Sequence, residues 1–311
     1  MNIPKKVTLI CTLILLLFKL GMAADKTASE SKTVAEMYPN LVSGVLTFAR
    51  LTELPSGLLL RSDGLEISAS DIDAIISKQP IYLQSQLQRN AFFILEQEAT
   101  GKILFRLAKK SLQQSEKKID IENERQVIQF YIENLAEKVV VTDDEAKQFY
   151  QDNKDMFGGS AFEQVKEPLK QYLLQQKQQE VIDKHIRTLG KRINIEVSAS
   201  WVKKYAALAK DNPVDQARYS GKPSLVDFGS VGCVPCDMMA PILDTLKEKY
   251  EGKLNVLFIH VREEPILASR YRVQTIPVQI FFDRTGKEVF RHTGFFPQEQ
   301  IESKLSQMGV K

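Results

Sequence analysis

The sequence predicts two domains: a mainly α-helical domain, followed by an α/β domain. The chain has 311 residues, more than one typical hydrophobic core accommodates. Through most of residues 37–204, apolar side chains recur at the three- and four-residue spacing of amphipathic helices. From Leu225 onward, short apolar runs typical of strands alternate with a helical stretch.

The composition is that of an ordinary folded protein, with 43% hydrophobic and 26% charged residues. The 42 basic and 39 acidic residues nearly balance, and the net charge is +3. A dedicated nucleic-acid-binding protein needs a concentrated basic face. We therefore expect no nucleic-acid partner.

Residues 1–23 have the features of a secretory signal peptide. Two lysines precede an apolar run from residue 7 to 18, and Gly21 and Ala23 follow it. A positive start, a short apolar stretch and a small-residue exit are the three parts of such a signal. A membrane span needs about 20 apolar residues, which is more than this run provides. We expect an exported protein cleaved after Ala23; an uncleaved membrane anchor is the alternative.

Residues 24–36 are rich in Ser, Lys and Glu, and we expect them to form a flexible segment ahead of the helical domain at residues 37–204. Within that domain, Ser70 with Asp73 has the spacing of a capping box. In this motif a hydroxyl side chain opens a helix and an acidic residue follows three positions later. A helix is therefore predicted to start at Ser70.

Thr142 with Glu145 is a second capping box, and its helix is expected to end near Gly158. A long helix should follow, with Pro168 in its first turns, where proline is tolerated best. A Gln-rich stretch interrupts the apolar pattern of this helix. Residues 193–197 then alternate between apolar and polar side chains, which predicts a short strand.

The joint between the two domains is predicted at residues 205–220. This stretch combines alanines with an Asn-Pro pair and leads into a Gly-Lys pair, a composition typical of a linker. The α/β domain is then expected to comprise residues 221–311.

The sequence contains three cysteines, and removal of the signal peptide would take Cys11 away. Exported proteins can form disulfides, but Cys233 and Cys236 would have no further cysteine with which to build a framework. A structural disulfide that closes so short a loop would also stabilise little. This pair is therefore expected to carry chemistry.

Two other uses of a C-x-x-C pair can be weighed. A structural zinc site normally has four Cys or His ligands, and the histidines His185, His260 and His292 are scattered along the chain. A c-type haem site needs a histidine directly after the second cysteine, and this chain has Asp237 there. We expect no metal and no cofactor.

The position of the cysteines predicts how they react. A helix that begins at Cys233 would place its sulfur beside free backbone N–H groups and the positive end of the helix dipole. Both favour the thiolate, which is the attacking species. Cys236 lies almost one turn later, so it can resolve the mixed disulfide that Cys233 forms with a client protein.

The segment VDFGSVGCVPCDMMAP (residues 226–241), with the Ile276-Pro277 pair farther on, resembles the thioredoxin family over about 90 residues. The resemblance implies a thioredoxin-like fold, in which a central mixed sheet is flanked by helices. It implies a thiol–disulfide oxidoreductase whose catalytic residues are Cys233, Cys236, Asp227 and Pro277. It also implies a cis bond before Pro277 and a buried acid at Asp227 that manages the proton of the resolving cysteine; hydrogen bonding to nearby backbone is the alternative role for this acid.

The same resemblance predicts the client-binding residues. It places the backbone of Ile276 where it can pair with an extended client strand, and Val234 and Pro235 on the client-binding surface. Without the resemblance, Pro277 would be read as an ordinary proline at the start of a strand.

The chain departs from the usual family pattern at four positions. Gly232 replaces the common tryptophan before the first cysteine, and Val234 replaces the glycine after it. Asp237 replaces a common lysine, and Phe258 falls where a lysine often faces the buried acid. The reduction potential and the proton route therefore cannot be transferred from thioredoxin.

The stretches ISASDIDAIISKQPIYLQSQLQRN, VVVTDDEAKQFYQDNKDMF and FEQVKEPLKQYLLQQKQQEVIDKHI resemble the helical segments of SurA/PpiC-type periplasmic chaperones. The resemblance covers residues 60–198 and lacks the parvulin domain, so we expect no prolyl isomerase activity. It implies binding of unfolded clients. The alternative is that the aromatic residues fill the core of the helical domain, namely Phe92, Phe93, Phe105, Phe130 and Tyr131.

The segments CVPCDMMAPIL and TIPVQIFFDRTGKEVFRHTGFF are similar to exported thioredoxin-like proteins that work with CcdA/DsbD-type membrane electron conduits. This similarity implies a periplasmic reductase that receives electrons from such a conduit. The partners would be client proteins with disulfides or free thiols. Two alternatives remain open at this point: a thiol oxidase or disulfide isomerase, and a holdase whose cysteine pair is regulatory.

Overall fold

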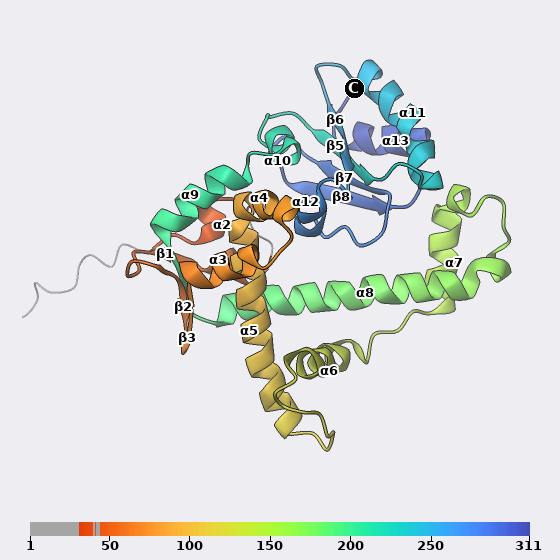
Figure 1. Ribbon diagram of the computed structural model, residues 1–311. Helices are drawn as coiled ribbons and strands as arrows, with labels where there is room; N and C mark the ends of the chain where they lie inside the picture. The colour runs from red at the N-terminus through yellow and green to blue at the C-terminus, as the bar shows by residue number, and fades with distance from the viewer. Residues whose placement is uncertain (1–30, 40, 42–43) are drawn as a thin grey trace, which may run out of the picture. The chain divides into compact units, whose positions relative to one another are not determined.

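The computed structural model describes residues 31–39, 41 and 44–311, and residues 33–311 form one compact unit (Figure 1). The predicted signal peptide at residues 1–23 lies outside the described residues. Among the described residues, no helix combines the length and apolar character that crossing a membrane requires.

The N-terminal part, up to residue 209, is mainly helical, as predicted. Its α-helices are α2 (Val34–Met37), α3 (Ala69–Ser77), α4 (Ile81–Arg89), α5 (Ala91–Gln113), α6 (Glu124–Ala136), α7 (Asp143–Asp152), α8 (Phe162–Arg192) and α9 (Ala199–Ala209). Two short 3₁₀ helices are η1 (Val45–Phe48) and η2 (Lys154–Phe157).

A small sheet that was not predicted joins strands from near the start and near the end of this N-terminal part. Its strands are β1 (Arg50–Thr52), β2 (Leu58–Ser62), β3 (Leu65–Ser68) and β4 (Ile195–Ser198), in the order β1-β4-β2-β3. Strand β4 confirms the strand predicted at residues 193–197. It pairs in parallel with β1, so a strand that follows α8 closes onto one near the start of the chain.

Several predicted boundaries change. Helix α3 is capped by Ser68 with Asp71, two residues earlier than the predicted pair, because Ser68 ends a strand and its hydroxyl accepts from Asp71 N at 3.2 Å. Helix α2 begins within the segment expected to be flexible, where Val34 is fully buried. The capping box of Thr142 with Glu145 is confirmed.

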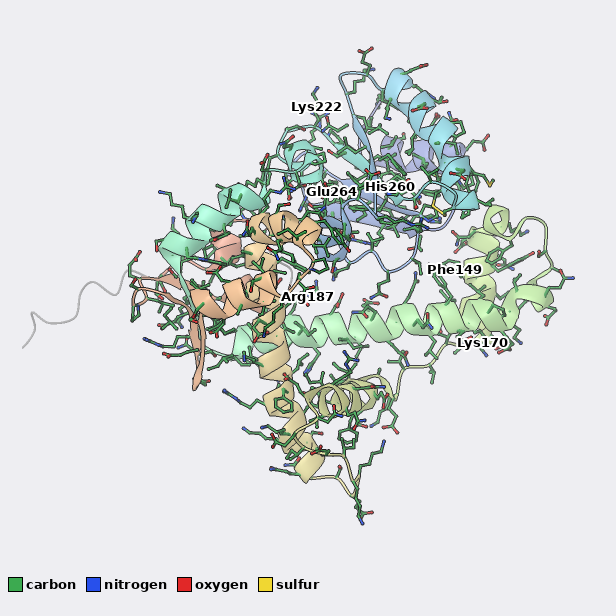
Figure 2. The ribbon with its side chains drawn as sticks, in the orientation of Figure 1. Phe149, Lys170, Arg187, Lys222, His260 and Glu264 are labelled. Carbon is green, nitrogen blue, oxygen red and sulfur yellow. A yellow bond between two sulfur atoms is a disulfide. The ribbon has the colours of Figure 1, made fainter. Side chains whose placement is uncertain are left out.

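Helix α8 is continuous over 31 residues and passes through the Gln-rich stretch without a break. It lies alongside α7, whose Asp143 accepts from Lys170 at 2.7 Å. Phe149 of α7 and Tyr172 of α8 pack with their ring centroids 6.0 Å apart. Figure 2 shows Lys170 on α8 and Phe149 on α7. The lysines of α8 thus pair with the acidic first turn of α7.

The C-terminal domain is a four-stranded mixed sheet with helices on both faces, which confirms the predicted fold class. Its elements are α10 (Pro213–Arg218), β5 (Ser224–Gly229), α11 (Val234–Lys249), β6 (Asn255–His260), α12 (Pro265–Arg270), β7 (Val278–Phe282), β8 (Glu288–Thr293) and α13 (Gln298–Gln307). The strand order is β6-β5-β7-β8; β5 and β6 are parallel, and β7 is antiparallel to both of its neighbours.

Alternate residues of β5 face opposite sides of this sheet. Leu225 packs with residues of α11 and α13, whereas Val226 and Phe228 pack with α10 and α12. Asp227 has the parity of Leu225, so its carboxylate lies on the face covered by α11. The pleat of one strand therefore brings this acid to the helix that carries the cysteines.

The predicted linker at residues 205–220 is corrected, because most of it is helical. Helix α9 continues to Ala209, and α10 begins at Pro213 after the cap residue Asn212. Asp215 and Arg218 of α10 are buried against the C-terminal domain. The Asn-Pro pair that looked like a break is a helix start, with the asparagine as N-cap and proline in the first turn.

Candidate redox site

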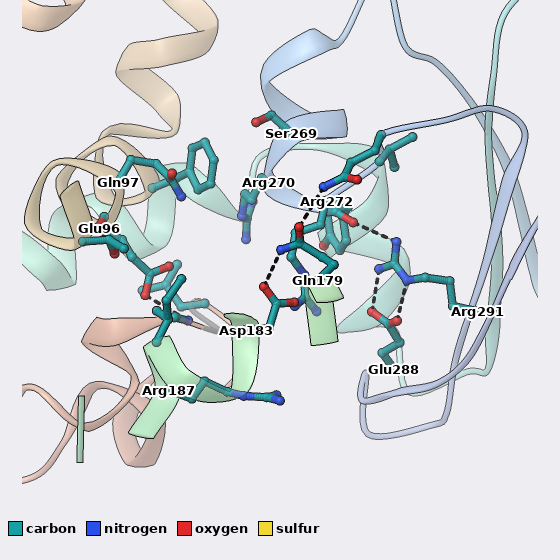
Figure 3. Close-up of a pocket in the computed structure, with 18 of the residues that line it drawn as sticks. Glu96, Gln97, Gln179, Asp183, Arg187, Ser269, Arg270, Arg272, Glu288 and Arg291 are labelled. Carbon is teal, nitrogen blue, oxygen red and sulfur yellow. Dashed lines mark hydrogen bonds and ion pairs between the residues drawn. The ribbon is translucent and has the colours of Figure 1, made fainter. Parts of the chain in front are cut away.

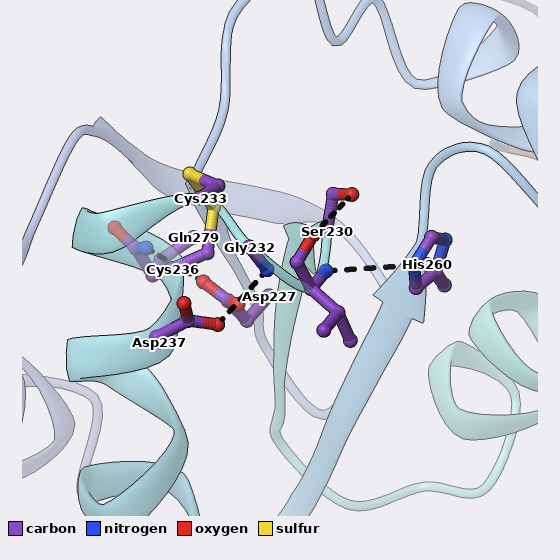
Figure 4. The surroundings of a disulfide bond; sticks show 9 residues. Asp227, Ser230, Gly232, Cys233, Cys236, Asp237, His260 and Gln279 are labelled. Carbon is purple, nitrogen blue, oxygen red and sulfur yellow. Dashed lines mark hydrogen bonds between the residues drawn. A yellow bond between two sulfur atoms is a disulfide. The ribbon is translucent and has the colours of Figure 1, made fainter.

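Cys233 and Cys236 form a disulfide at the N-terminus of α11, with their Cα atoms 5.2 Å apart (Figure 4). Cys233 is the N-cap residue, as predicted, and its carbonyl accepts from the backbone N–H groups of Cys236 (2.8 Å) and Asp237 (2.9 Å). Cys233 is partly buried, whereas Cys236 is only 3% exposed. After reduction, the outer sulfur is the one that a client can reach.

The loop before the cysteines explains one departure from the family pattern. Gly232 has φ +79°, in the left-handed region that favours glycine over any residue with a side chain. The backbone N–H of Gly232 donates to Asp237 Oδ1 at 3.4 Å. A tryptophan at this position would be strained in the observed backbone.

Asp227 is a buried acid whose side chain has one hydrogen-bond partner among the described residues. Its side chain is 0% exposed, and Oδ1 accepts from Gln279 Nε2 at 2.6 Å. Oδ2 is buried and has no hydrogen-bond partner in the described part of the chain. Burial raises the pKa of Asp227 to about 6, and the hydrogen bond from Gln279 partly opposes this rise. The group can therefore exchange a proton near neutral pH.

Gly229, at the end of β5, lies between Asp227 and the buried cysteine. A Cβ placed on Gly229 would lie 3.4 Å from Asp227 Oδ2, 3.4 Å from Cys236 Cβ and 2.8 Å from Phe258 Cε2. The last distance is too short for a real carbon contact. The absent side chain leaves room for the ring of Phe258, the residue that falls where the family often has a lysine.

The peptide bond between Ile276 and Pro277 is cis, as predicted. Pro277 is buried, and its carbonyl accepts from Gly294 N at 2.8 Å. Within the described residues, no hydrogen bond involves the backbone N–H or carbonyl of Ile276. The main chain there remains available to an extended segment.

Val234 and Pro235, expected on the client-binding surface, differ in accessibility. Val234 is 72% exposed, and Val231 in the preceding loop is 73% exposed. Pro235 is partly buried within the first turn of α11. An accessible apolar rim therefore lies next to the redox pair.

Two residues of this site were missed in the sequence. Gln279 is a fully buried polar residue in a strand that otherwise reads Val-Ile-Phe-Phe, and Gly229 ends the strand that carries Asp227. An amide within such an apolar strand is the signal that could have pointed to Gln279, because buried polar groups need partners. Its partner could not be identified from sequence, since Asp227 lies 52 residues away.

The redox cysteines do not line the cavity shown in Figure 3. That cavity, of about 600 Å³, is lined by residues of α5, α8 and the C-terminal domain. Two pairs of its charged groups contact one another: Arg272 with Asp183, and Arg291 with Glu288 at 2.8 Å. The disulfide lies instead beside the exposed rim described above. No cluster of three or more potential metal ligands occurs among the described residues.

Comparison with known proteins agrees with this geometry. A family model of thioredoxin-like domains matches residues 211–309, so the match begins with α10 rather than at the predicted boundary of 221. Thioredoxin of Alicyclobacillus acidocaldarius subsp. acidocaldarius is 38% identical over 96 residues, which are 31% of this chain and 90% of that protein. Thioredoxin of Staphylococcus aureus is 42% identical over 81 residues, 26% of this chain and 77% of that protein.

A crystal structure of chloroplastic thioredoxin z is 29% identical in sequence and covers 30% of this chain and 85% of its own, with a TM-score of 0.29. The sequence matches cover the segment that carries the C-x-x-C pair, and the domain is that of a thiol–disulfide oxidoreductase. Through this C-terminal domain, the chain belongs to the thioredoxin family.

Proposed function

We propose that this protein is an exported, periplasmic reductase of client-protein disulfides, and that its helical domain captures the clients. The observation that carries the proposal is the unequal burial of the two sulfurs. Cys233 is partly exposed at the N-terminus of a 16-residue helix, whereas Cys236 is buried. One cysteine is thus placed to attack a protein disulfide and the other to resolve the product.

The reaction proceeds in two exchanges. The Cys233 thiolate, favoured by the helix N-terminus, attacks a client disulfide and displaces one client thiolate. Cys236 then attacks the Cys233 sulfur, which releases the second client thiolate and closes the Cys233–Cys236 disulfide. Two electrons pass from the cysteine pair to the client. An external donor, for which we propose a CcdA/DsbD-type membrane conduit, must reduce the pair again.

Two features of the C-terminal domain suit an extended polypeptide. Val231 and Val234 offer exposed apolar side chains, and the unpaired backbone of Ile276 offers a hydrogen-bond donor and an acceptor. Backbone pairing binds strands regardless of sequence, and apolar contacts add area. The proposed clients are therefore unfolded or extended segments that contain a disulfide.

The helical domain has its own exposed apolar residues. Ile81 is 80% exposed and Tyr82 is 73% exposed at the start of α4. Phe92 and Phe130, by contrast, are buried, which supports a core role for these two aromatics. We place client capture on the exposed pair. Joining a capture surface to Cys233 raises the local concentration of client disulfide at the sulfur.

Redox state in the source cells tests the direction of electron flow. Thiols would be trapped in intact cells with acid and an alkylating agent, and the modified fraction of Cys233 and Cys236 counted. A mostly reduced pair that becomes oxidised when the conduit is deleted supports the reductase. A mostly oxidised pair, unchanged by that deletion, would instead assign the protein to disulfide formation.

Purified variants separate the enzyme from a holdase. Cys233→Ser should abolish reduction of insulin disulfides and leave suppression of client aggregation intact. The double variant Ile81→Ser/Tyr82→Ser should weaken aggregation suppression and leave reduction of small disulfides unchanged. Val140→Ser/Val181→Ser is the matched control, because both valines are also exposed on the N-terminal part. Equal loss in both double variants would argue against capture at Ile81 and Tyr82.

A further inference from the structure

Four residues form one row across the C-terminal sheet. Phe258 of β6 lies directly opposite Asp227 of β5, Asp227 opposite Gln279 of β7, and Gln279 opposite His292 of β8. Directly opposite residues point to the same face of a sheet, and their Cβ atoms are about 5 Å apart. Gln279 is therefore the cross-strand neighbour of the buried acid, on the side away from Phe258.

The amide of Gln279 engages only one carboxylate oxygen. Its Nε2 donates to Asp227 Oδ1 at 2.6 Å, and both side chains are 0% exposed. Gln279 Oε1 and Asp227 Oδ2 are both buried and have no hydrogen-bond partner among the residues that the structure describes. Because an unpartnered buried polar atom costs free energy, a pair left half-satisfied suggests a role other than packing.

The free oxygen is the one on the cysteine side. Asp227 Oδ2 and Cys236 Cβ each lie 3.4 Å from the point where a Cβ of Gly229 would sit. Phe258 covers the same point from β6, with Cε2 2.8 Å from it. Oδ1 accepts from Gln279, whereas Oδ2 has no partner among the described residues, so Oδ2 is the oxygen more open to an incoming proton (Figure 4).

We infer that Gln279 is a positioning residue for the redox reaction: it holds Asp227 through Oδ1 and reserves Oδ2 for the proton of Cys236. In the resolving step the Cys236 S–H bond breaks and its proton passes to Oδ2. The Cys236 sulfur forms the bond to Cys233 and displaces the client thiolate, which keeps the electron pair of the broken S–S bond. The inference rests on Cys233 and Cys236 acting as the redox pair.

The hydrogen bond has a second effect in the same direction. A donor to the ionised carboxylate favours the charged form, so Gln279 opposes the rise in the pKa of Asp227 that burial causes. Without this donor, more of Asp227 is already protonated below neutral pH and cannot accept another proton. Loss of the amide should therefore slow the resolving step in acid and leave it nearly unchanged above pH 8.

The test uses the full chain with Cys11→Ser, so that only the redox pair reacts. Reduced protein is mixed with excess 5,5′-dithiobis(2-nitrobenzoate) in a stopped-flow instrument. The first release of thionitrobenzoate reports attack by Cys233, and the second reports resolution by Cys236. The variant is Gln279→Met, which keeps the length of the side chain. Gln307→Met is the matched control, because Gln307 is exposed on α13.

For Gln279→Met we expect the first phase to be unchanged and the second to be about tenfold slower at pH 5, since one pKa unit is a tenfold change in the ionised fraction. Its pH midpoint should move up by about one unit. The control should match the parent at every pH. An unchanged second phase, or equal slowing of both phases, would overturn the inference.

A double-mutant cycle separates positioning from general damage to the fold. In an Asp227→Asn background the second phase should already be about 100-fold slower, as expected for loss of a general base. Adding Gln279→Met should then change it less than about twofold, because its partner is gone. Further slowing would assign Gln279 a structural role only.

Two further outcomes are distinguishable. If Gln279→Met does not fold, Gln279→Glu keeps size and polarity; it makes two carboxyl groups share a proton and should raise the midpoint further. An unmoved midpoint in that variant would contradict the inference. If Cys233 and Cys236 are not the redox pair, the parent protein itself would lack the two-phase release.

Discussion

Asp215 and Asp227 are both 0% exposed in the C-terminal domain, yet their surroundings differ. Asp215 is surrounded by donors: Arg270 at 2.6 Å, Arg218 at 3.2 Å, the Tyr271 hydroxyl at 2.9 Å and the Asn212 amide at 2.7 Å. Within the part of the chain that the structure describes, the side chain of Asp227 has one neutral amide as its partner, and its second oxygen has none.

The difference shows that burial alone does not determine the role of an acidic side chain. A buried carboxylate with two guanidinium partners has its charge balanced, and removing it would leave buried cations alone. A buried carboxylate without a cation has its pKa raised, and this makes it useful in proton transfer. Asp215 thus serves the fold, whereas Asp227 has the raised pKa and the open oxygen that the proposed proton transfer requires, although the two side chains are chemically identical.

The largest effect on stability is expected for Asp215→Ala. Arg218 and Arg270 would lose their buried carboxylate, and such a loss typically costs about 3–5 kcal/mol. Urea unfolding followed by circular dichroism measures it. Asp244→Ala is the control: Asp244 is exposed on α11, and its loss should change stability by less than about 0.5 kcal/mol. If Asp215→Ala and Asp244→Ala had similar urea midpoints, Asp215 would not stabilise the fold, and its contrast with Asp227 would be lost.

Asp227→Asn should change stability in the opposite direction and stabilise the protein. The folded-state pKa of about 6 lies above the unfolded value of 3.8, so the folded protein binds the proton more tightly and stability falls as pH rises between these values. Above pH 7 this cost is complete, at about 3 kcal/mol. The variant should be more stable than the parent by up to that amount at pH 8 and equal to it below pH 4. A gain independent of pH would contradict this account.

The smallest effect is expected for Gly229→Ala. The added Cβ would press on Phe258, which is 40% exposed and can swing outward, so the cost should be about 1–2 kcal/mol. Displacing the ring would admit water to Asp227 and lower its pKa toward 3.8. The pH dependence of stability should therefore flatten. Phe258→Ala should flatten it too; if both variants keep the parent's pH dependence, the ring does not shield the acid.

Local patterns predicted much of the site. The C-x-x-C pair at the start of α11 follows from a short sequence segment, whereas the resemblance to the thioredoxin family implied the cis bond before Pro277 and the buried acid at Asp227. The structure places all of them in the redox domain. The capping box at Thr142 was equally local. The C-x-x-C pair and the capping box are determined by neighbours in the chain, which a single sequence displays.

Features that depend on distant partners were missed. Gln279 acquires its meaning from a strand 52 residues earlier, and β1 pairs with β4, whose residues are 146 positions away in the sequence. Strands β1 and β4 are short, and the weak apolar alternation of β1 gives little sequence signal for a strand. Helix α10 was read as a linker because Asn-Pro marks turns as well as helix starts. Only its burial against the sheet decides between them.

The position of α10 determines where this protein could be divided. Arg218 donates through Nε to the carbonyl of Gly286 in the β7–β8 turn, and Asp215 of the same helix holds Arg270 of α12. A cut at residue 221 would separate those groups, whereas a cut before Asn212 would keep them together. The redox domain therefore begins with that short helix. A recombination event that transfers this domain with these contacts intact must include α10.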